Sequence, residues 1–206
     1  MTEPSVVAMG LEEVAPDVYH WRIENDLIGG EWSSSHAVRA AEGSVLVDPV
    51  LLAADALGRL EPVVAVVLTA ACHQRSAWRY RQRFGAPVWL PRGSRATEEE
   101  PDELYGDGDL VPGGLRAVHT PGPELPHYSL LLEREPAVLF SPDLVMLDRR
   151  RGELVFVPAQ YHEDPAETRR SVEHAAELDF EILCLSHGPP VSDGPTALRG
   201  LLARTA

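Results

Sequence analysis

The stretch VVAVVL, residues 63–68, constrains the fold more than any other part of the sequence. All six residues are apolar and four of them are valine, which is typical of a strand buried on both faces. Small and polar residues follow from Thr69 onward, among them the neighbours Cys72 and His73. Because α/β proteins commonly place their chemistry in loops at strand ends, this loop is the first candidate for a functional site.

Short strands and two helices fill the first half of the chain. Apolar alternation and turn residues predict strands at 18–23, 36–41, 44–48, 63–68 and 87–90. Helical spacing of apolar residues predicts helices at 51–60 and 76–84. This order predicts a mixed α/β fold rather than a series of strict βαβ units.

The second half of the sequence contains further strands and one clear helix. The same signals predict strands at 115–119, 128–132, 137–140, 145–147, 154–157 and 180–185. Asp164 and Pro165 are a typical N-cap and first position for a helix that extends to about Leu178. The acidic segment 91–114 is interpreted as a solvated connection, with a calcium or interaction role as the alternative. No repeat or linker interrupts residues 1–206, which predicts a single domain.

Composition excludes several classes of partner. The net charge is −14 and all 18 basic residues are arginine, which argues against a nucleic-acid surface and against a polybasic membrane segment. No apolar run is long enough to cross a bilayer. The two cysteines, Cys72 and Cys184, form no disulfide framework and favour a cytoplasmic location. A small-molecule ligand or substrate is therefore the expected partner, and a homo-oligomer stays open.

Five segments, in this order and at this spacing, carry a family resemblance: SVLVDP, VVLT, HTPG, VLFSPD and SHGPP. Together they make the chain resemble the metallo-β-lactamase superfamily from about Val18 to Pro190. The resemblance implies an αββα four-layer sandwich, in which two mixed β-sheets pack face to face with helices outside. It also implies an active site along one edge, on loops that follow strands.

The same resemblance shows that most metal ligands of the family are replaced. After the VVLT strand the family has Thr-His-x-His-x-Asp-His, and a further histidine follows its HTPG loop. The corresponding positions that cannot bind a metal in the usual way here are Ala70, Gln74, Arg75 and Pro123. Asp143 and His187 remain in ligand positions, and Cys72 is a third candidate ligand. The sequence therefore predicts no dinuclear centre, and either no metal or a single zinc, iron or manganese ion.

Two functional hypotheses follow from these replacements. The first is a divergent family member that has lost the dinuclear centre and keeps its cleft for small-molecule binding or residual hydrolysis. The alternative is an active hydrolase of a small ester, thioester or amide with one unusually ligated metal. In either case Asp143, His187 and His73 are the candidate catalytic residues, although His73 could equally face solvent. Cys72 could be a reactive thiolate or an inert packed residue.

Neighbouring residues are expected to support this site. By the resemblance, Asp48 fixes adjacent loops by accepting backbone N–H bonds, and His119 supports its own loop. His36 and His127 are interpreted either as residues at the pocket mouth or as structural histidines. We also expect Arg75 to pair with Asp143 in place of a metal, or else to turn outward along its helix.

Overall fold

The computed structural model describes residues 3–205, and within them the chain forms fifteen strands and four α-helices. The first sheet comprises β1 (Glu12–Ala15), β2 (Val18–Glu24), β3 (Trp32–Ala40), β4 (Gly43–Val47), β5 (Val63–Val67), β6 (Val88–Pro91) and β7 (Glu103–Tyr105). The second comprises β8 (Leu110–Val111), β9 (Leu115–His119), β10 (Tyr128–Leu132), β11 (Val138–Ser141), β14 (Ile182–Leu185) and β15 (Val191–Ser192). A separate hairpin is made of β12 (Val145–Asp148) and β13 (Glu153–Phe156).

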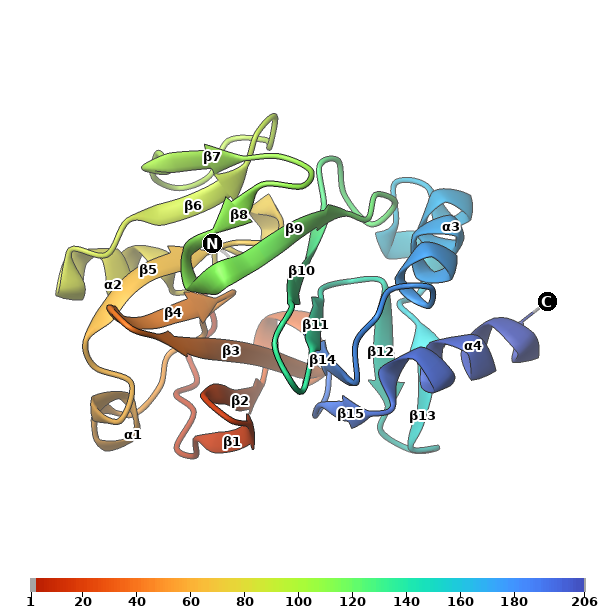
Figure 1. Cartoon of the computed structure of the whole chain (residues 1–206), viewed down its shortest axis with the longest axis horizontal. Helices are drawn as coiled ribbons and strands as arrows, with labels where there is room; N and C mark the ends of the chain where they lie inside the picture. The colour runs from red at the N-terminus through yellow and green to blue at the C-terminus, as the bar shows by residue number, and fades with distance from the viewer. Residues whose placement is uncertain (1–2, 206) are drawn as a thin grey trace.

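Both large sheets are mixed. In the first, the strands lie in chain order from β1 to β7, antiparallel up to β4 and parallel from β4 to β7. In the second, the order is β15-β14-β11-β10-β9-β8, and only β11 and β14 are parallel. The α-helices are α1 (Ala54–Gly58), α2 (Ala77–Phe84), α3 (Pro165–Ala175) and α4 (Gly194–Arg204). Figure 1 shows α1 and α2 on one side of the sheets, with α3 and α4 on the other.

Three apolar clusters separate four layers, and side-chain alternation in the strands produces them. Along β4, Val45 and Val47 point into the cluster between the sheets, whereas Leu46 points into the cluster beneath α1 and α2. In the second sheet, Leu130 faces the first sheet and Leu131 faces the cluster under α3 and α4. The predicted αββα sandwich of two mixed sheets is confirmed.

Some element boundaries differ from the sequence prediction. The helix expected at 51–60 covers only Ala54–Gly58, because Leu52 is bridged to Ala8 and the amide of Ala53 donates to the Ala8 carbonyl. The helix expected to reach Leu178 ends at Ala175. Its predicted N-cap is confirmed, since the Asp164 carboxylate accepts from the backbone N–H of Glu167. Strands β1 and β15 and helix α4 were not predicted.

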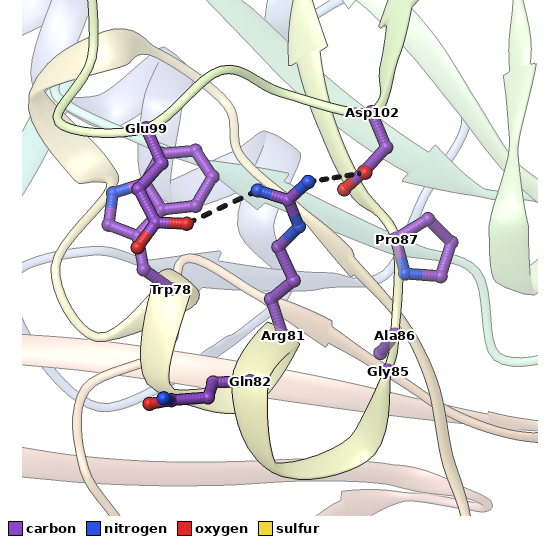
Figure 2. A pocket seen from close by; sticks show the side chains of 8 residues that line it. All are labelled: Trp78, Arg81, Gln82, Gly85, Ala86, Pro87, Glu99 and Asp102. Atoms are coloured by element: carbon purple, nitrogen blue, oxygen red, sulfur yellow. Dashed lines mark hydrogen bonds and ion pairs between the residues drawn. The ribbon is translucent and has the colours of Figure 1, made fainter.

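The acidic segment after β6 is not simply a solvated connection. It contains strands β7 and β8, and Tyr105 of β7 is fully buried. Its Glu99 and Asp102 hold the guanidinium of Arg81 on α2 at 3.2 and 2.7 Å, beside a surface hollow of about 460 Å³ (Figure 2). The segment therefore folds back onto helix α2. Across the described residues, no helix has the length and apolar character needed to cross a membrane.

Candidate metal centre

Two pairs of neighbouring parallel strands end at the same edge of the sandwich. Strand β4 runs beside β5 in the first sheet, and β11 runs beside β14 in the second. Parallel neighbours bring the residues beyond their carboxyl ends together. These residues supply most of the site: Asp48, Thr69, Asp143 and His187.

Asp48 anchors the part of the site that comes from the first sheet. Its Oδ1 accepts from the backbone N–H of Thr69 at 2.9 Å, and its Oδ2 accepts from the Thr69 hydroxyl at 2.5 Å. This confirms the expected role of Asp48 in fixing the adjacent loop. The same Oδ2 also lies 3.0 Å from Nδ1 of His73. Burial favours a raised pKa for Asp48, but the charge and hydrogen bond of His73 lower it.

His73 lies inside the site and does not face solvent. It ends the short 3-10 helix Ala71–His73 and is 4% exposed. Its Nε2 lies 3.2 Å from Oδ2 of Asp143, so the imidazole bridges two carboxylates. Burial and the nearby Arg75 act to lower the pKa of His73, but Asp143 and Asp48 raise it to about 9. In this arrangement the ring is a cation at neutral pH.

Asp143 is the centre of the network. Besides His73, it contacts Nε2 of His187 through Oδ1 at 2.8 Å and accepts from the Ser186 hydroxyl at 3.2 Å. Burial would raise the pKa of Asp143, yet the two histidines hold it well below its usual value. Nδ1 of His187 lies 2.6 Å from the carbonyl of Trp32, which can only accept, so Nδ1 carries a proton and Nε2 is directed at Asp143.

Cys72 borders the same carboxylate. Its Sγ lies 3.8 Å from Oδ2 of Asp143, and it is partly exposed. Burial raises the pKa of the Cys72 thiol well above its usual value, and the charges of Asp143 and Glu124 raise it further. The thiol is therefore protonated at neutral pH unless a cation approaches it.

The expectation for Arg75 is wrong in both of its forms. The guanidinium neither pairs with Asp143 nor turns outward, because its Nη1 donates to the carbonyls of Ser34 and Asp48 at 2.6 and 2.9 Å. Arg75 is only 5% exposed and has a left-handed backbone conformation, with φ at 38°. This conformation, after the short 3-10 turn, directs Arg75 into the first sheet and leaves His73 to reach Asp143.

The other histidines singled out in the sequence lie outside the contact network of Asp143. His36 and His127 are buried, at 3% and 0% exposure, and His36 lines a small cavity of about 10 Å³ together with Asp48 and Thr69. His127 directs Nδ1 to the Thr120 carbonyl at 2.6 Å, and burial lowers its pKa to about 4. His119 is exposed, and its backbone N–H donates to Asp107. Among the described residues, the Nε2 atoms of His36 and His127 have no hydrogen-bond partner.

Sequence reasoning missed two contributors to the site. The carbonyl of Trp32 orients His187, and a backbone carbonyl has no signature in the sequence. Glu124 accepts from the backbone N–H of Cys72 at 3.2 Å and is 7% exposed. A signal for Glu124 was present, since this acidic residue directly follows Pro123, where the family has a histidine ligand.

Three donor atoms that could hold a metal ion come together beside Asp143. Sγ of Cys72, a ring nitrogen of His73 and a carboxylate oxygen of Asp143 all lie within 4.8 Å of one another. Thiolate, imidazole and carboxylate are all zinc ligands, and three protein ligands are the usual number at a catalytic zinc. His187 lies outside this group and contacts the second oxygen of Asp143. The catalytic roles predicted for Asp143, His187 and His73 stay predictions.

Comparison with known proteins gives one family. The profile described as the metallo-β-lactamase superfamily matches residues 12–203. No curated protein matches the chain. Among solved structures, FIM-1 from Pseudomonas aeruginosa in its mono-zinc form superposes with a TM-score of 0.74 at 14% identity, over 100% of this chain and 99% of that one.

Two further structures give the same fold. The metallo-β-lactamase DIM-1 has a TM-score of 0.74 at 14% identity, over 96% of this chain and 98% of its own. A metallo-β-lactamase family protein from Thermus thermophilus has a TM-score of 0.69 at 18% identity, over 94% of this chain and 80% of its own. These identities establish the fold alone, whereas the profile match spans nearly the whole sequence. The chain belongs to the metallo-β-lactamase superfamily.

Proposed function

We propose that this protein is a hydrolase that uses a single divalent metal ion held by Cys72, His73 and Asp143. The observation that carries the proposal is the convergence of three different donor groups within 4.8 Å at the carboxyl edge of the strands. Three protein ligands leave a coordination position open, as at catalytic zinc sites.

The surroundings of the donors support this proposal. Nδ1 of His73 faces the Asp48 carboxylate, the arrangement that fixes a histidine with Nε2 available for a metal. On the other side, His187 contacts the second oxygen of Asp143 and is itself oriented by the Trp32 carbonyl. Groups in such positions commonly change metal affinity about 10–100-fold when removed.

The mixed donor set favours zinc over the other two candidate metals. Thiolate and imidazole are ligands that zinc prefers, whereas manganese prefers oxygen ligands and iron oxygenase sites use two histidines and a carboxylate. When bound, such an ion would supply Lewis-acid polarisation of a scissile carbonyl. We assign to His187 the transfer of a proton at Nε2, because its side chain is 15% exposed and contacts Asp143.

The substrate class rests on the family. We propose a small ester, thioester or amide, since family members with this fold include enzymes named as β-lactamases. The mono-zinc form of FIM-1 indicates that this fold can hold one ion. We further propose a cytoplasmic location, because a reducing compartment keeps the Cys72 thiol available as a ligand.

A second candidate function is supported by the charge of His73. The imidazolium between Asp48 and Asp143 compensates the buried carboxylates without a metal. A protein of this kind would bind a small molecule at the site and would not hydrolyse it. This candidate corresponds to loss of the metal centre in a divergent family member.

Metal content separates the two candidates. The protein is purified without chelator from cells supplied with zinc, iron or manganese, and its metal content is measured by elemental analysis. We expect about one zinc per chain in the wild type, and loss of it in Cys72→Ser and His73→Gln. Cys184→Ser is the matched control, because Cys184 is buried between the sheets and should not alter metal content. Two ions per chain would contradict the proposal, and no ion with any metal would favour the second candidate.

Hydrolysis is then measured with 4-nitrophenyl acetate, a thioester and a simple anilide. The zinc-loaded wild type should hydrolyse at least one of them, and His187→Gln should have a lower kcat when it is compared at full zinc occupancy. A fully loaded protein that hydrolyses none of the three would contradict the proposed reaction class.

A further inference from the structure

Glu124 is a buried carboxylate beside the candidate metal centre. It lies in the loop between β9 and β10, and its side chain is 9% exposed. Its Oε2 accepts from the backbone N–H of Cys72 at 3.2 Å. A buried carboxylate is costly unless its charge is paired and its oxygens are hydrogen-bonded. One hydrogen bond to a backbone amide satisfies only part of this requirement.

The second oxygen of Glu124 has a weak partner. Nε of Arg95 lies 2.7 Å from Oε1, yet Oε1 is buried and makes no hydrogen bond of acceptable geometry within the described residues. The Arg95 side chain is 66% exposed and comes from the segment that follows β6. An ion pair with such an exposed partner contributes little and is easily broken.

Cys72 contacts two carboxylates. Its backbone N–H donates to Glu124, which lies in the loop before β10, and its Sγ lies 3.8 Å from Oδ2 of Asp143, which follows β11. A divalent cation is the group that could compensate two carboxylates and a thiolate together.

We propose that Glu124 is a fourth ligand of the cation site formed by Cys72, His73 and Asp143, and that Arg95 neutralises Glu124 while no cation is bound. This inference rests on the proposed function. Glu124 is not among the residues whose donor atoms lie within 4.8 Å of one another, so on cation binding its side chain turns toward those donors while the guanidinium of Arg95 moves into solvent. Arg95 and the cation therefore compete for the same carboxylate.

The competition predicts opposite effects of two substitutions on zinc affinity. Zinc dissociation constants are measured by competition with a chromophoric chelator, without reference to hydrolysis. Glu124→Gln, which keeps the shape and an acceptor for Cys72, should weaken binding by about tenfold or more, since one ligand charge is lost. Arg95→Gln should tighten binding by about threefold, and this gain should shrink at high salt because Arg95 is exposed.

Matched controls come from the same segment. Glu98→Gln and Arg92→Gln each remove one charge from the segment that carries Arg95. Among the described residues neither side chain pairs with Glu124, so both variants should leave zinc affinity unchanged within about twofold. Circular dichroism and the melting temperature check that every variant is folded. If Glu124→Gln does not fold, the affinity gain in Arg95→Gln and its salt dependence still decide the inference.

Cobalt substitution distinguishes a direct ligand from a nearby charge. The cobalt d–d bands should change in Glu124→Gln and stay the same in Arg95→Gln, while the thiolate charge-transfer band of Cys72 persists in both. Wild-type zinc affinity in both variants would overturn the inference and leave the proposed metal site intact. No zinc binding by the wild type or by either variant would overturn both, whereas zinc bound only by Arg95→Gln would support the competition.

Discussion

Two pairs of histidines lie in opposite charge environments within this sandwich. His20 and His36, on β2 and β3, have ring centroids 5.3 Å apart, and neither Nε2 has a hydrogen-bond partner among the described residues. His73 and His187 lie 6.4 Å apart and both contact Asp143. Burial, with a smaller effect of Arg22, lowers the pKa of His20 to about 4. The pKa of His73, equally buried, is raised to about 9.

The comparison teaches that burial alone does not decide the charge of a histidine here. Removing an imidazolium from water favours the neutral ring, as at His20 and His36. Two carboxylates in contact reverse this preference at His73. His73, at the edge of the sandwich that carries the site, is therefore buried as a cation, whereas His20 and His36 on the neighbouring strands β2 and β3 are buried as neutral rings.

The largest expected effect comes from replacing the charged histidine. His73→Phe leaves Asp48 and Asp143 without their shared cation, and should lower the free energy of unfolding by about 3–5 kcal/mol. His36→Phe is the matched control, because its Nε2 has no partner to lose and an apolar ring suits its surroundings. Urea denaturation at pH 7 measures both. Similar losses of the free energy of unfolding in the two variants would contradict the difference in charge environment between His73 and His36.

His73 and His20 should change the free energy of unfolding at opposite ends of the pH range, His73 at alkaline pH and His20 at acid pH. The folded pKa of His73 is above its unfolded value of about 6.5. Its contribution in the metal-free protein is therefore complete below about pH 6.5 and is lost as the pH rises through about 9. The shift corresponds to at most about 3 kcal/mol. His73→Gln should flatten this alkaline limb in urea denaturation between pH 6 and 10.

His20 should act on the acid limb. Its folded pKa of about 4 lies below the unfolded value, so its contribution is present above about pH 6.5 and is lost as the pH falls through about 4. His20→Phe should therefore reduce the loss of stability between pH 6.5 and 4 and leave the alkaline limb unchanged. An altered alkaline limb would show that the two pairs are coupled.

A smaller effect is expected from Asp48→Asn, which keeps the side-chain shape but removes one of the two carboxylate charges that contact His73. The pKa of His73 should fall by about 1 unit or more, because Asp143 alone then favours the imidazolium. Titration of the His73 ring by NMR measures this directly. An unchanged pKa would assign the whole effect to Asp143.

The smallest effect is expected at Thr69. Thr69→Val removes the hydroxyl that donates to Asp48 and lies 3.1 Å from Nδ1 of His73. The loss of one buried hydrogen bond should cost about 1 kcal/mol in urea denaturation. A loss as large as that of His73→Phe would mean that the hydroxyl, and not the ion pairs, holds the loop.

The layered fold was predictable because its signals are local. Alternating apolar residues in β4 and the continuous run in β5 specify which faces are buried. The N-cap at Asp164 follows from its side chain alone. By contrast, β1 is a short edge strand and β15 has only two residues, too short for a periodic signal.

The sequence predicted four side chains that come together at the site, but not how the side chains there are oriented. The order of segments indicated that Asp143, His187, Cys72 and His73 come together. It could not indicate the direction of Arg75, which depends on a left-handed backbone at that residue and a 3-10 turn before it. Nor could it indicate that His73 bridges two carboxylates, because this depends on how the two sheets dock.

The contact between His187 and the Trp32 carbonyl joins residues that are 155 positions apart. Asp48 and His73 follow strands β4 and β5 of the first sheet, whereas Asp143 and His187 follow strands β11 and β14 of the second. During synthesis, the Asp48–His73 pair can therefore form long before Asp143 and His187 have left the ribosome. The proposed cation site is completed only when the second sheet docks on the first, because Asp143 comes from the second sheet and Cys72 and His73 from the loop after β5. On this assignment, metal held by all three ligands would mark a chain whose two sheets have docked.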